Sequence, residues 1–306
     1  MEPSIVSLLP SCTEIVCALG LEKHLVGRSH ECDYPPDIRD LPICTAPKFD
    51  SNGTSQQIDE NVSELVKQGL SVYLVDVDLL QKLNPQFILT QSQCEVCAVS
   101  YKEVEIAVAK LIDAEPAIID LRPNRLSDIF NDIIQVSEVL GVYQKGKDRL
   151  EQYLNRLDRI KEKICDLDHK PIVVAIEWLE PLMLAGNWVP EIVEMAGGVN
   201  AIGKAGKHSH YHQWHEIFDV DPDVITIMPC GFGIQRTLLE MELLTKTPGW
   251  GDLKAVREKR VYITDGNHYF NRPGPRIIDS VEIMAEILHP QMFIPSYEKT
   301  GYIRYN

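Results

Sequence analysis

Two cysteines separated by two residues, Cys94 and Cys97, carry the clearest capacity for chemistry. They follow an apolar run at residues 87–90, which is typical of a buried strand. His30 and Cys32 follow another apolar run earlier in the chain. Thiolates and imidazoles at short spacing are the ligands that zinc and other soft divalent metals prefer. These four residues are therefore candidate metal ligands, and the alternatives are a redox-active pair or thiols that only pack.

A second group of soft ligands lies in the segment from His208 to His215, which contains four histidines. A neutral imidazole binds cobalt in a corrinoid, iron in haem, or a free divalent metal, and His212 is the candidate. Trp214 in the same segment, and Trp188 before it, would supply apolar walls for a ligand. The alternative is an exposed polar loop with both tryptophans in the core.

The segment from Thr264 to Arg276 is polar and aromatic, and it lies between an apolar strand expected at 261–264 and an amphipathic helix. The junction of a strand and a helix is where α/β proteins hold ligands. Tyr269 and Phe270 offer flat apolar faces, and Arg272 or Arg276 can meet an anionic group. The alternative is a tight connection whose prolines and glycine only fix the turn.

Two further side chains are expected to face the same ligand. Glu177 follows the strand expected at 172–176, and Phe232 follows the strand expected at 224–228. Gly231 would permit the backbone to approach a ligand closely. We therefore count Glu177 and Phe232 among the ligand-binding candidates.

Short β-rich runs alternate with helical periodicity along the whole chain, which predicts parallel sheets covered by helices. Further strands are expected at residues 5–8, 72–75 and 117–120. Residues 11–14 have the pattern of a capping box, Gly20 is expected to close the helix that follows, and residues 46–61 are expected to form a loop.

Apolar residues between Leu150 and Ile164 repeat at helical spacing, which predicts one long amphipathic helix from about Lys147 to Cys165. The predicted fold is therefore α/β, with two Rossmann-like lobes joined by a single long backbone helix. The lobes are expected at residues 1–145 and 167–306, and the linking helix at 146–166.

The composition excludes several classes of partner. The net charge of −15 and the pI near 5.0 argue against nucleic acid and anionic membranes. The chain of 306 residues shows no secretory signal and no apolar run long enough to cross a bilayer, so no membrane insertion is expected. Eight cysteines without an export signal favour a reduced, cytoplasmic location.

Several motifs occur in an order that resembles the helical-backbone (class III) substrate-binding proteins of ABC transporters, and most closely their cobalamin-binding branch. The motifs lie at residues 5–20, 25–35, 83–89, 196–198, 221–225 and 264–276. The resemblance implies two lobes joined by a rigid helix, with the ligand held between them and little hinge motion. It also implies vitamin B12, a siderophore or a metal as the ligand class.

The chain departs from this family at positions that matter for binding. Glu31 stands where the cobalamin-binding branch has a tyrosine, and Gln91 replaces an expected aromatic residue. Asp78 lies near one expected importer-docking acid, but His215 stands where the second would fall. The expectation is therefore that docking to an importer is doubtful.

The sequence contains no glycine-rich phosphate loop, nucleophile elbow or pair of catalytic carboxylates, so we expect no enzyme. The expected function is binding of a corrinoid, such as cobalamin, or a related metal-containing cofactor in the cleft between the lobes. The alternative is a cytosolic carrier or sensor that holds zinc or another divalent metal with Cys and His, and a metal-dependent or thiol enzyme is a third class.

Overall fold

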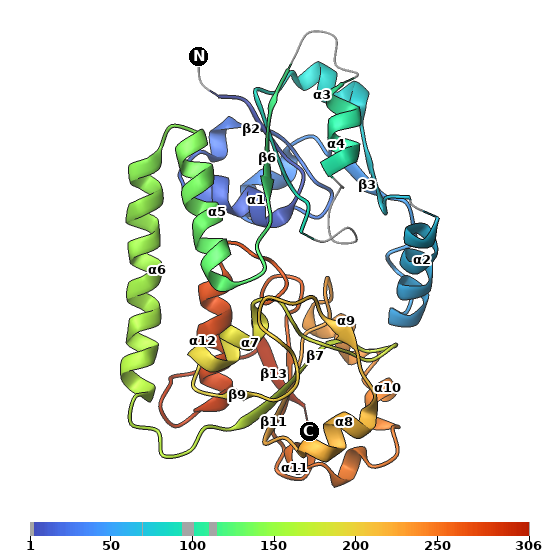
Figure 1. Cartoon of the computed structure of the whole chain (residues 1–306), viewed down its shortest axis with the longest axis vertical. Coiled ribbons are helices and arrows are strands. Elements are labelled where there is room, and N and C mark those ends of the chain that lie inside the picture. Colours follow the sequence, from blue (N-terminus) through green and yellow to red (C-terminus); the bar gives the residue numbers. More distant parts are fainter. Residues whose placement is uncertain (1–2, 69, 94–100, 110–114, 306) are drawn as a thin grey trace. The chain divides into compact units, whose positions relative to one another are not determined.

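The computed structural model describes residues 3–68, 70–93, 101–109 and 115–305, and it divides the chain into two compact α/β units (Figure 1). The first unit contains Met1–Gly53, Gln57–Pro123 and Ser127–Glu151, and the second contains Thr54–Gln56, Asn124–Leu126 and Gln152–Asn306. The prediction of an α/β protein with two lobes is confirmed. Two short segments from the first half of the chain belong to the second unit.

The first unit is built on a parallel sheet in the order β2-β1-β5-β6. Central strand β1 is buried along its whole length, as a strand covered on both faces must be. Helices α3 and α4 lie on one side of this sheet, and α5 lies on the other (Figure 1). The bounds are β1 Ile5–Ser7, α1 Pro10–Ala18, β2 Leu25–Arg28, β3 Thr45–Pro47, α2 Ser55–Lys67, β4 Tyr73–Val75, α3 Val77–Leu83, β5 Phe87–Gln91, α4 Tyr101–Val108, β6 Ala117–Leu121 and α5 Leu126–Val139.

One strand and one loop of this unit differ in part from expectation. The strand expected at 72–75 is present as β4, but it pairs antiparallel with β3 and lies outside the parallel sheet. The expectation of a loop throughout 46–61 is wrong, because this range contains the start of α2. Helix α2 has apolar residues on one face only, and its high polar content concealed that periodicity in the sequence.

The expected capping box at residues 11–14 does not form. Helix α1 begins at Pro10, its N-cap residue Leu9 makes no side-chain cap, and Ser11 Oγ has no hydrogen-bond partner. A proline at the first position moves the helix start two residues earlier than the Ser-x-x-Glu pattern requires. Gly20 follows this helix with a φ of 68°, which fits the expected helix end.

The second unit has a mixed sheet in the order β10-β8-β7-β11-β12-β13. Strands β7, β11 and β12 are parallel, whereas β8 and β13 run antiparallel to their neighbours, and β9 pairs with β7. The strand bounds are β7 Ile172–Trp178, β8 Met183–Leu184, β9 Val199–Asn200, β10 His210–Tyr211, β11 Val224–Ile227, β12 Val261–Thr264 and β13 Tyr302–Tyr305.

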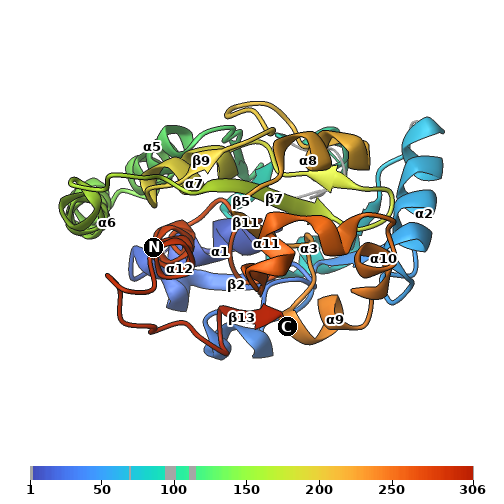
Figure 2. The same ribbon diagram turned by 90° about the horizontal axis from the view of Figure 1, so that it is seen from below.

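Helices cover both faces of this second sheet. α7 and α12 pack against each other on one side, and α8, α10 and α11 gather on the other (Figures 1 and 2). The buried cluster on the latter side includes Ile217, Ile225 and Trp250. The helix bounds are α7 Val189–Met195, α8 Trp214–Val220, α9 Ile234–Leu238, α10 Glu242–Thr245, α11 Lys254–Arg257 and α12 Ile277–Leu288.

The predicted long helix is present as α6, which is continuous from Tyr143 to Ile164. Its apolar face buries Tyr153, Leu157 and Ile160. The division between the two units falls inside this helix, between Glu151 and Gln152. Among the described residues, no helix combines the length and apolar character needed to cross a membrane.

Candidate functional site

The carboxyl ends of the three parallel strands in the second unit bring aromatic and acidic side chains to one edge of the sheet. Glu177 and Trp178 end β7, the segment 229–232 follows β11, and the segment 265–268 follows β12. The register of β7, β11 and β12 places these three ends side by side. This edge is where open α/β sheets hold ligands, so it is the candidate site.

Two aromatic rings form the apolar part of this edge. The rings of Trp178 and Phe232 lie 5.2 Å apart at a tilt of 53°. The Arg236 guanidinium stacks over Phe232 at 4.5 Å and also pairs with Glu240. Phe232 is buried beneath this arginine, whereas Trp178 is partly exposed. Trp178 is therefore the aromatic side chain of the pair that a ligand can reach.

Ser55, the first residue of α2, is hydrogen-bonded to this edge. The Trp178 indole N–H donates to the Ser55 carbonyl oxygen at 3.2 Å. The Ser55 backbone N–H donates to the Glu240 carboxylate, with distances of 2.9 and 3.2 Å to its two oxygens. Ser55 is completely buried, so the start of α2 is held by side chains of the second unit.

Glu177 is held by a single side-chain hydrogen bond. Ser209 Oγ donates to Glu177 Oε2 at 2.7 Å, and it accepts a hydrogen bond from the Gly186 N–H at 2.9 Å. Burial raises the pKa of Glu177 to about 7, and the bond from Ser209 opposes that rise. The carboxyl group therefore changes its charge close to neutral pH.

The segment after β12 is organised by Asp265. One carboxylate oxygen accepts the backbone N–H groups of Asn267 and His268, and the other lies 2.7 Å from His268 Nδ1. Arg272 is buried and donates to Asn267 Oδ1 at 3.0 Å. Arg272 thus supports the loop, and the expected contact with an anionic ligand does not fit its burial.

The aromatic residues that were expected to contact a ligand differ in how deeply they are buried. Phe270 has no exposed surface, and its carbonyl oxygen accepts the indole N–H of Trp188, which is 5% exposed. Both side chains belong to the core, which argues against the predicted ligand contacts of Phe270 and Trp188. Tyr269 is partly exposed and stacks with Arg276 at 5.5 Å, so its contact remains a prediction.

The histidine segment does not converge on a metal. His212 Nδ1 lies 2.9 Å from Glu216 Oε2, one turn along the chain. Backbone hydrogen bonding at Gln213 and the bond with His212 lower the pKa of Glu216. Trp214 packs between Phe218 and Trp250, at ring distances of 6.0 and 5.9 Å, and it contacts the apolar core. These contacts give both side chains partners within the fold, and the predicted ligand contacts of His212 and Trp214 stay predictions.

In the first unit, His30 and Cys32 are engaged separately. His30 Nδ1 lies 2.7 Å from Thr45 Oγ1, and burial, followed by the charge of Arg28, lowers its pKa. Cys32 is buried with its Sγ 3.0 Å from Thr13 Oγ1. Nowhere in residues 3–68, 70–93, 101–109 or 115–305 do three His, Cys, Asp or Glu side chains gather as metal ligands do. Cys94 and Cys97 lie outside the described residues.

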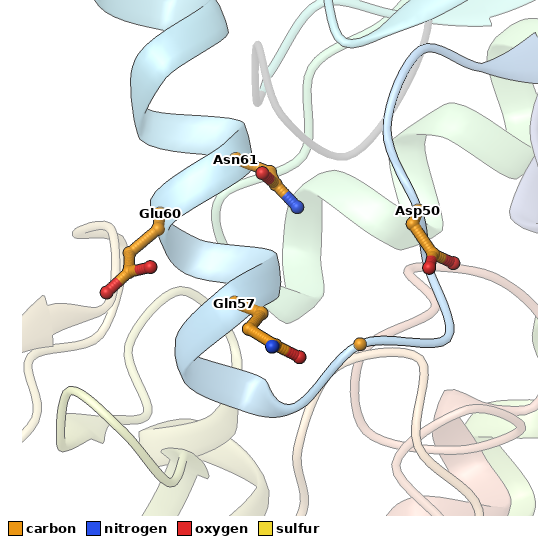
Figure 3. Close-up of a pocket in the computed structure, with 5 residues that line it drawn as sticks. Asp50, Gln57, Glu60 and Asn61 are labelled. Atoms are coloured by element: carbon orange, nitrogen blue, oxygen red, sulfur yellow. The ribbon is translucent and has the colours of Figure 1, made fainter.

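An open hollow of about 260 Å³ lies between α2 and the loop before it, within the first unit. Asp50, Gly53, Gln57, Glu60 and Asn61 line it, and Gln57 and Asn61 point from the helix towards the loop of Asp50 (Figure 3). The lining offers no aromatic or thiol group. It is therefore a poorer match for a large cofactor than the edge at Trp178.

The structure adds residues that sequence reasoning did not select. Ser209 lies inside the histidine segment, where the imidazoles drew attention away from a hydroxyl group. Asp265 and His268 occur in the loop that was selected for its aromatic residues. No sequence signal connects Ser55 to Glu240, because 185 residues separate them.

The sequence profile described as periplasmic binding protein matches residues 5–267. An uncharacterized ABC transporter substrate-binding lipoprotein, YvrC, of Bacillus subtilis is 24% identical over 295 residues, which cover 94% of this chain and 81% of the relative. A vitamin B12-binding protein of Vibrio cholerae is 23% identical, with 93% of this chain and 88% of that protein covered. These matches extend over nearly the whole chain.

Among solved structures, the periplasmic haem-binding protein RhuT of Roseiflexus in its apo form superposes with a TM-score of 0.70 at 21% identity. The alignment covers 96% of this chain and all of the other. At this identity the likeness supports the fold, and it agrees with the two-lobed architecture.

These findings decide two expectations. Substrate-binding proteins of this family bind without catalysis, so the expectation that the chain is not an enzyme is confirmed. The expectation of a cytoplasmic location is wrong, because the family is periplasmic and the Bacillus relative is a lipoprotein. Both point to a location outside the cytoplasm. The absence of a recognisable signal in the sequence was therefore a poor guide.

Proposed function

The chain belongs to the periplasmic binding protein family, and we propose that this substrate-binding protein binds a corrinoid at the carboxyl edge of the second unit's sheet. The observation that carries the proposal is that a partly exposed aromatic side chain, Trp178, and the carboxyl group of Glu177 both end strand β7 at this edge of the sheet. A corrinoid presents a wide apolar face and a rim of polar amides, and this edge offers a partner for each.

The relatives support a tetrapyrrole-like ligand without deciding between its forms. One relative is a vitamin B12-binding protein, and a structural neighbour is a haem-binding protein. Both ligands are large macrocycles that hold a metal. An aromatic side chain contributes about 1.5–3 kcal/mol when its apolar surface is buried, which suits either macrocycle.

The charges at the edge favour a corrinoid over haem. Haem carries two propionate groups, which cationic side chains stabilise. Here Arg236 pairs with Glu240, His268 pairs with Asp265, and Arg272 is buried in the loop. Glu177 adds an acid. A ligand whose rim carries uncharged amides meets fewer unfavourable charges at this edge than a dicarboxylate does.

The proposal is tested by titrating ligand-free protein with cyanocobalamin and with hemin, followed by calorimetry and visible absorbance. We expect saturable binding of cyanocobalamin with a 1:1 stoichiometry and weaker binding of hemin. Tighter binding of hemin would replace the corrinoid with haem as the ligand. Failure of both to bind would reject the proposal.

We further propose that the loaded protein delivers its ligand to an ABC importer, as the Bacillus relative's name as an ABC transporter substrate-binding lipoprotein suggests. The expected doubt about docking rested on single positions, and relatives of this kind lead us to set it aside. In proteoliposomes that contain the partner importer, the loaded protein should stimulate ATP hydrolysis more than an unrelated protein of similar negative charge does. Equal stimulation would contradict delivery.

A further inference from the structure

We propose that Glu177 is a specificity-determining residue that favours an uncharged amide or hydroxyl group of the ligand and disfavours a carboxylate at the same position. The inference rests on the proposed function, because it concerns the polar rim of the ligand bound beside Trp178. Nothing in the comparisons assigns a role to this glutamate.

The hydrogen bonds around Ser209 determine which oxygen of Glu177 is available. Ser209 Oγ accepts the Gly186 N–H at 2.9 Å, so its own proton is directed to Glu177 Oε2 at 2.7 Å. While Ser209 donates to Oε2, a proton taken up by Glu177 resides on Oε1, and Oε1 then changes from acceptor to donor.

Backbone contacts hold Ser209 in this position. A Cβ atom added to Gly186 would lie 2.3 Å from the Lys207 carbonyl oxygen, so only glycine allows the two chain segments to approach this closely. The Asn187 N–H donates to the Lys207 carbonyl, and the Gly206 N–H donates to the Asn187 carbonyl at 2.8 Å. Ser209 is thus a positioning residue on a fixed segment.

The second oxygen of Glu177 remains for a ligand. Within the part of the chain that the structure describes, Ser209 is the side chain that hydrogen bonds to Glu177, and no ion pair includes this glutamate. The residue is partly exposed at the strand end. A ligand donor can therefore reach the carboxyl oxygen that Ser209 leaves free.

The groups around Glu177 leave its charge to be balanced by the ligand. His208 and His210 flank Ser209, and the Cys230 backbone N–H donates to the Glu177 carbonyl oxygen. The causes of the raised pKa of Glu177 are burial and the Ser209 bond, and none of these three side chains contributes. No nearby cation contributes to the pKa of Glu177, so the ionised carboxylate has no counter-charge among these neighbours.

An amide and a carboxylate respond differently to this arrangement. An amide offers its N–H to ionised Glu177 and, after rotation, its carbonyl oxygen to the protonated form, so it is satisfied in both states. A carboxylate can only accept, and it pairs only with the protonated form. Discrimination against a ligand carboxylate should therefore grow as the pH rises through about 7.

The test uses cyanocobalamin and its three monocarboxylate derivatives, in each of which one propionamide is hydrolysed to an acid. Dissociation constants are measured between pH 5.5 and 8.5 for the unmodified protein, Glu177→Gln and Ser209→Ala. Glu177→Gln keeps the side-chain shape and removes the titration, and thermal unfolding confirms that each variant is folded.

We expect the affinity of the unmodified protein for cyanocobalamin to change less than threefold over this range. At least one monocarboxylate should lose about tenfold or more in affinity between pH 6 and 8.5, which is the size that one titrating group near pH 7 allows. Glu177→Gln should abolish that loss. Ser209→Ala should move its midpoint to higher pH, because the bond that opposes the raised pKa is removed.

The two proposals fail in different ways. If cyanocobalamin and its derivatives do not bind at all, the corrinoid function is rejected. If they bind, but no derivative shows a pH-dependent loss, or the loss persists in Glu177→Gln, the role of Glu177 is rejected while the corrinoid function stands.

Discussion

Trp178 and Trp188 are ten residues apart, yet their surroundings assign them opposite roles. Trp178 is partly exposed beside Phe232, whereas Trp188 is 5% exposed and donates its indole N–H to the Phe270 carbonyl. Trp178→Ala should weaken cyanocobalamin binding by about 10- to 100-fold, because burial of one large apolar side chain against a ligand contributes about 1.5–3 kcal/mol. Trp188→Ala should mainly lower the free energy of unfolding. Calorimetry and urea denaturation of both variants separate these effects, and equal losses of affinity would contradict the assignment.

Phe270 supports the fold through its burial. Its side chain is fully buried, and its backbone adopts a φ of 56° while its N–H donates to Ser280 Oγ at 3.0 Å. Phe270→Ala should therefore lower the free energy of unfolding by about 3–5 kcal/mol, the usual cost of removing a buried ring. Tyr269→Ala, at the partly exposed neighbouring position, should cost about 1 kcal/mol or less. Urea denaturation measures the free energy of unfolding of both variants, and equal losses would contradict the prediction.

At the residue scale, the sequence indicated where ligand residues would lie better than which ones they would be. The loop 264–276 does begin at the carboxyl end of β12, and Glu177 lies at the carboxyl end of β7 in the same sheet. Burial then divided the aromatic candidates, placing Phe270 and Trp188 in the core. Residue type and spacing do not report the side chain's depth, because both exposed and buried aromatic residues suit a strand end.

Helix α5 carries a buried acid that makes stability depend on pH. Asp132 is 6% exposed, one of its oxygens has no hydrogen-bond partner, and burial, followed by the charges of Asp128 and Asp120, raises its pKa to about 7. The folded state thus binds a proton that the unfolded state releases near pH 4. The contribution of Asp132 to the free energy of unfolding is fully present below about pH 4, and it is lost as the pH rises from about 4 to about 7.

Asp132→Asn should remove this loss. The variant is expected to unfold with a free energy about 2–4 kcal/mol higher than the unmodified protein at pH 8, and with a similar value at pH 4, where the acid is neutral. Urea denaturation at the two pH values measures the difference. A gain of equal size at pH 4 would show that the effect does not come from ionisation.

An ionic network joins the C-terminal half of α6 to α12. Arg156 donates to Asp279 and to both oxygens of Glu282, at 2.9 and 2.7 Å for Glu282, and the Tyr297 hydroxyl donates to Glu282 at 2.7 Å. Arg156→Met leaves two partly buried acids without their cation, so it should cost about 1–3 kcal/mol of unfolding free energy. Arg159→Met, at an exposed position of the same helix, should cost less than about 0.5 kcal/mol. Thermal unfolding would refute this if the two variants were equally stable.

At the element scale, strong periodicity was the reliable guide. Six predicted strands take their places in the two main sheets, and the long helix was recognised from its apolar face. Helix α2 and strand β3 were missed, because polar helices and short strands carry weak patterns, and β4 was predicted as a strand but not as the antiparallel partner of β3. The capping box failed because Pro10 already fits the first turn of α1.

At the scale of the whole molecule, the order of motifs along the chain identified the family, and the family then corrected the location. Each motif is short, but together they span residues 5–276, which is close to the extent of the family match at 5–267. The ligand is a finer property than the fold. It depends on a few polar and aromatic side chains at one edge, which the overall pattern does not constrain.

The two units are not consecutive in the sequence, and this limits how the protein can be divided. The second unit includes Thr54–Gln56 and Asn124–Leu126. Glu240 accepts the Ser55 N–H, and Glu191 accepts the Leu126 N–H at 2.9 Å while it pairs with Arg125. A fragment that begins at Gln152 would keep both glutamates and lose both partners.

All four tryptophans, Trp178, Trp188, Trp214 and Trp250, lie within residues 152–306, so intrinsic fluorescence follows the second unit in the fragment and in the intact chain alike. The fragment should unfold at a lower temperature, because two carboxylates lose the helix N-termini they cap. Matching transitions would show that the borrowed segments are dispensable. A less stable fragment would mean that the second unit cannot be exchanged between relatives as a simple C-terminal half. A chimaera should fold well only when residues 54–56 and 124–126 come from the same relative as residues 152–306.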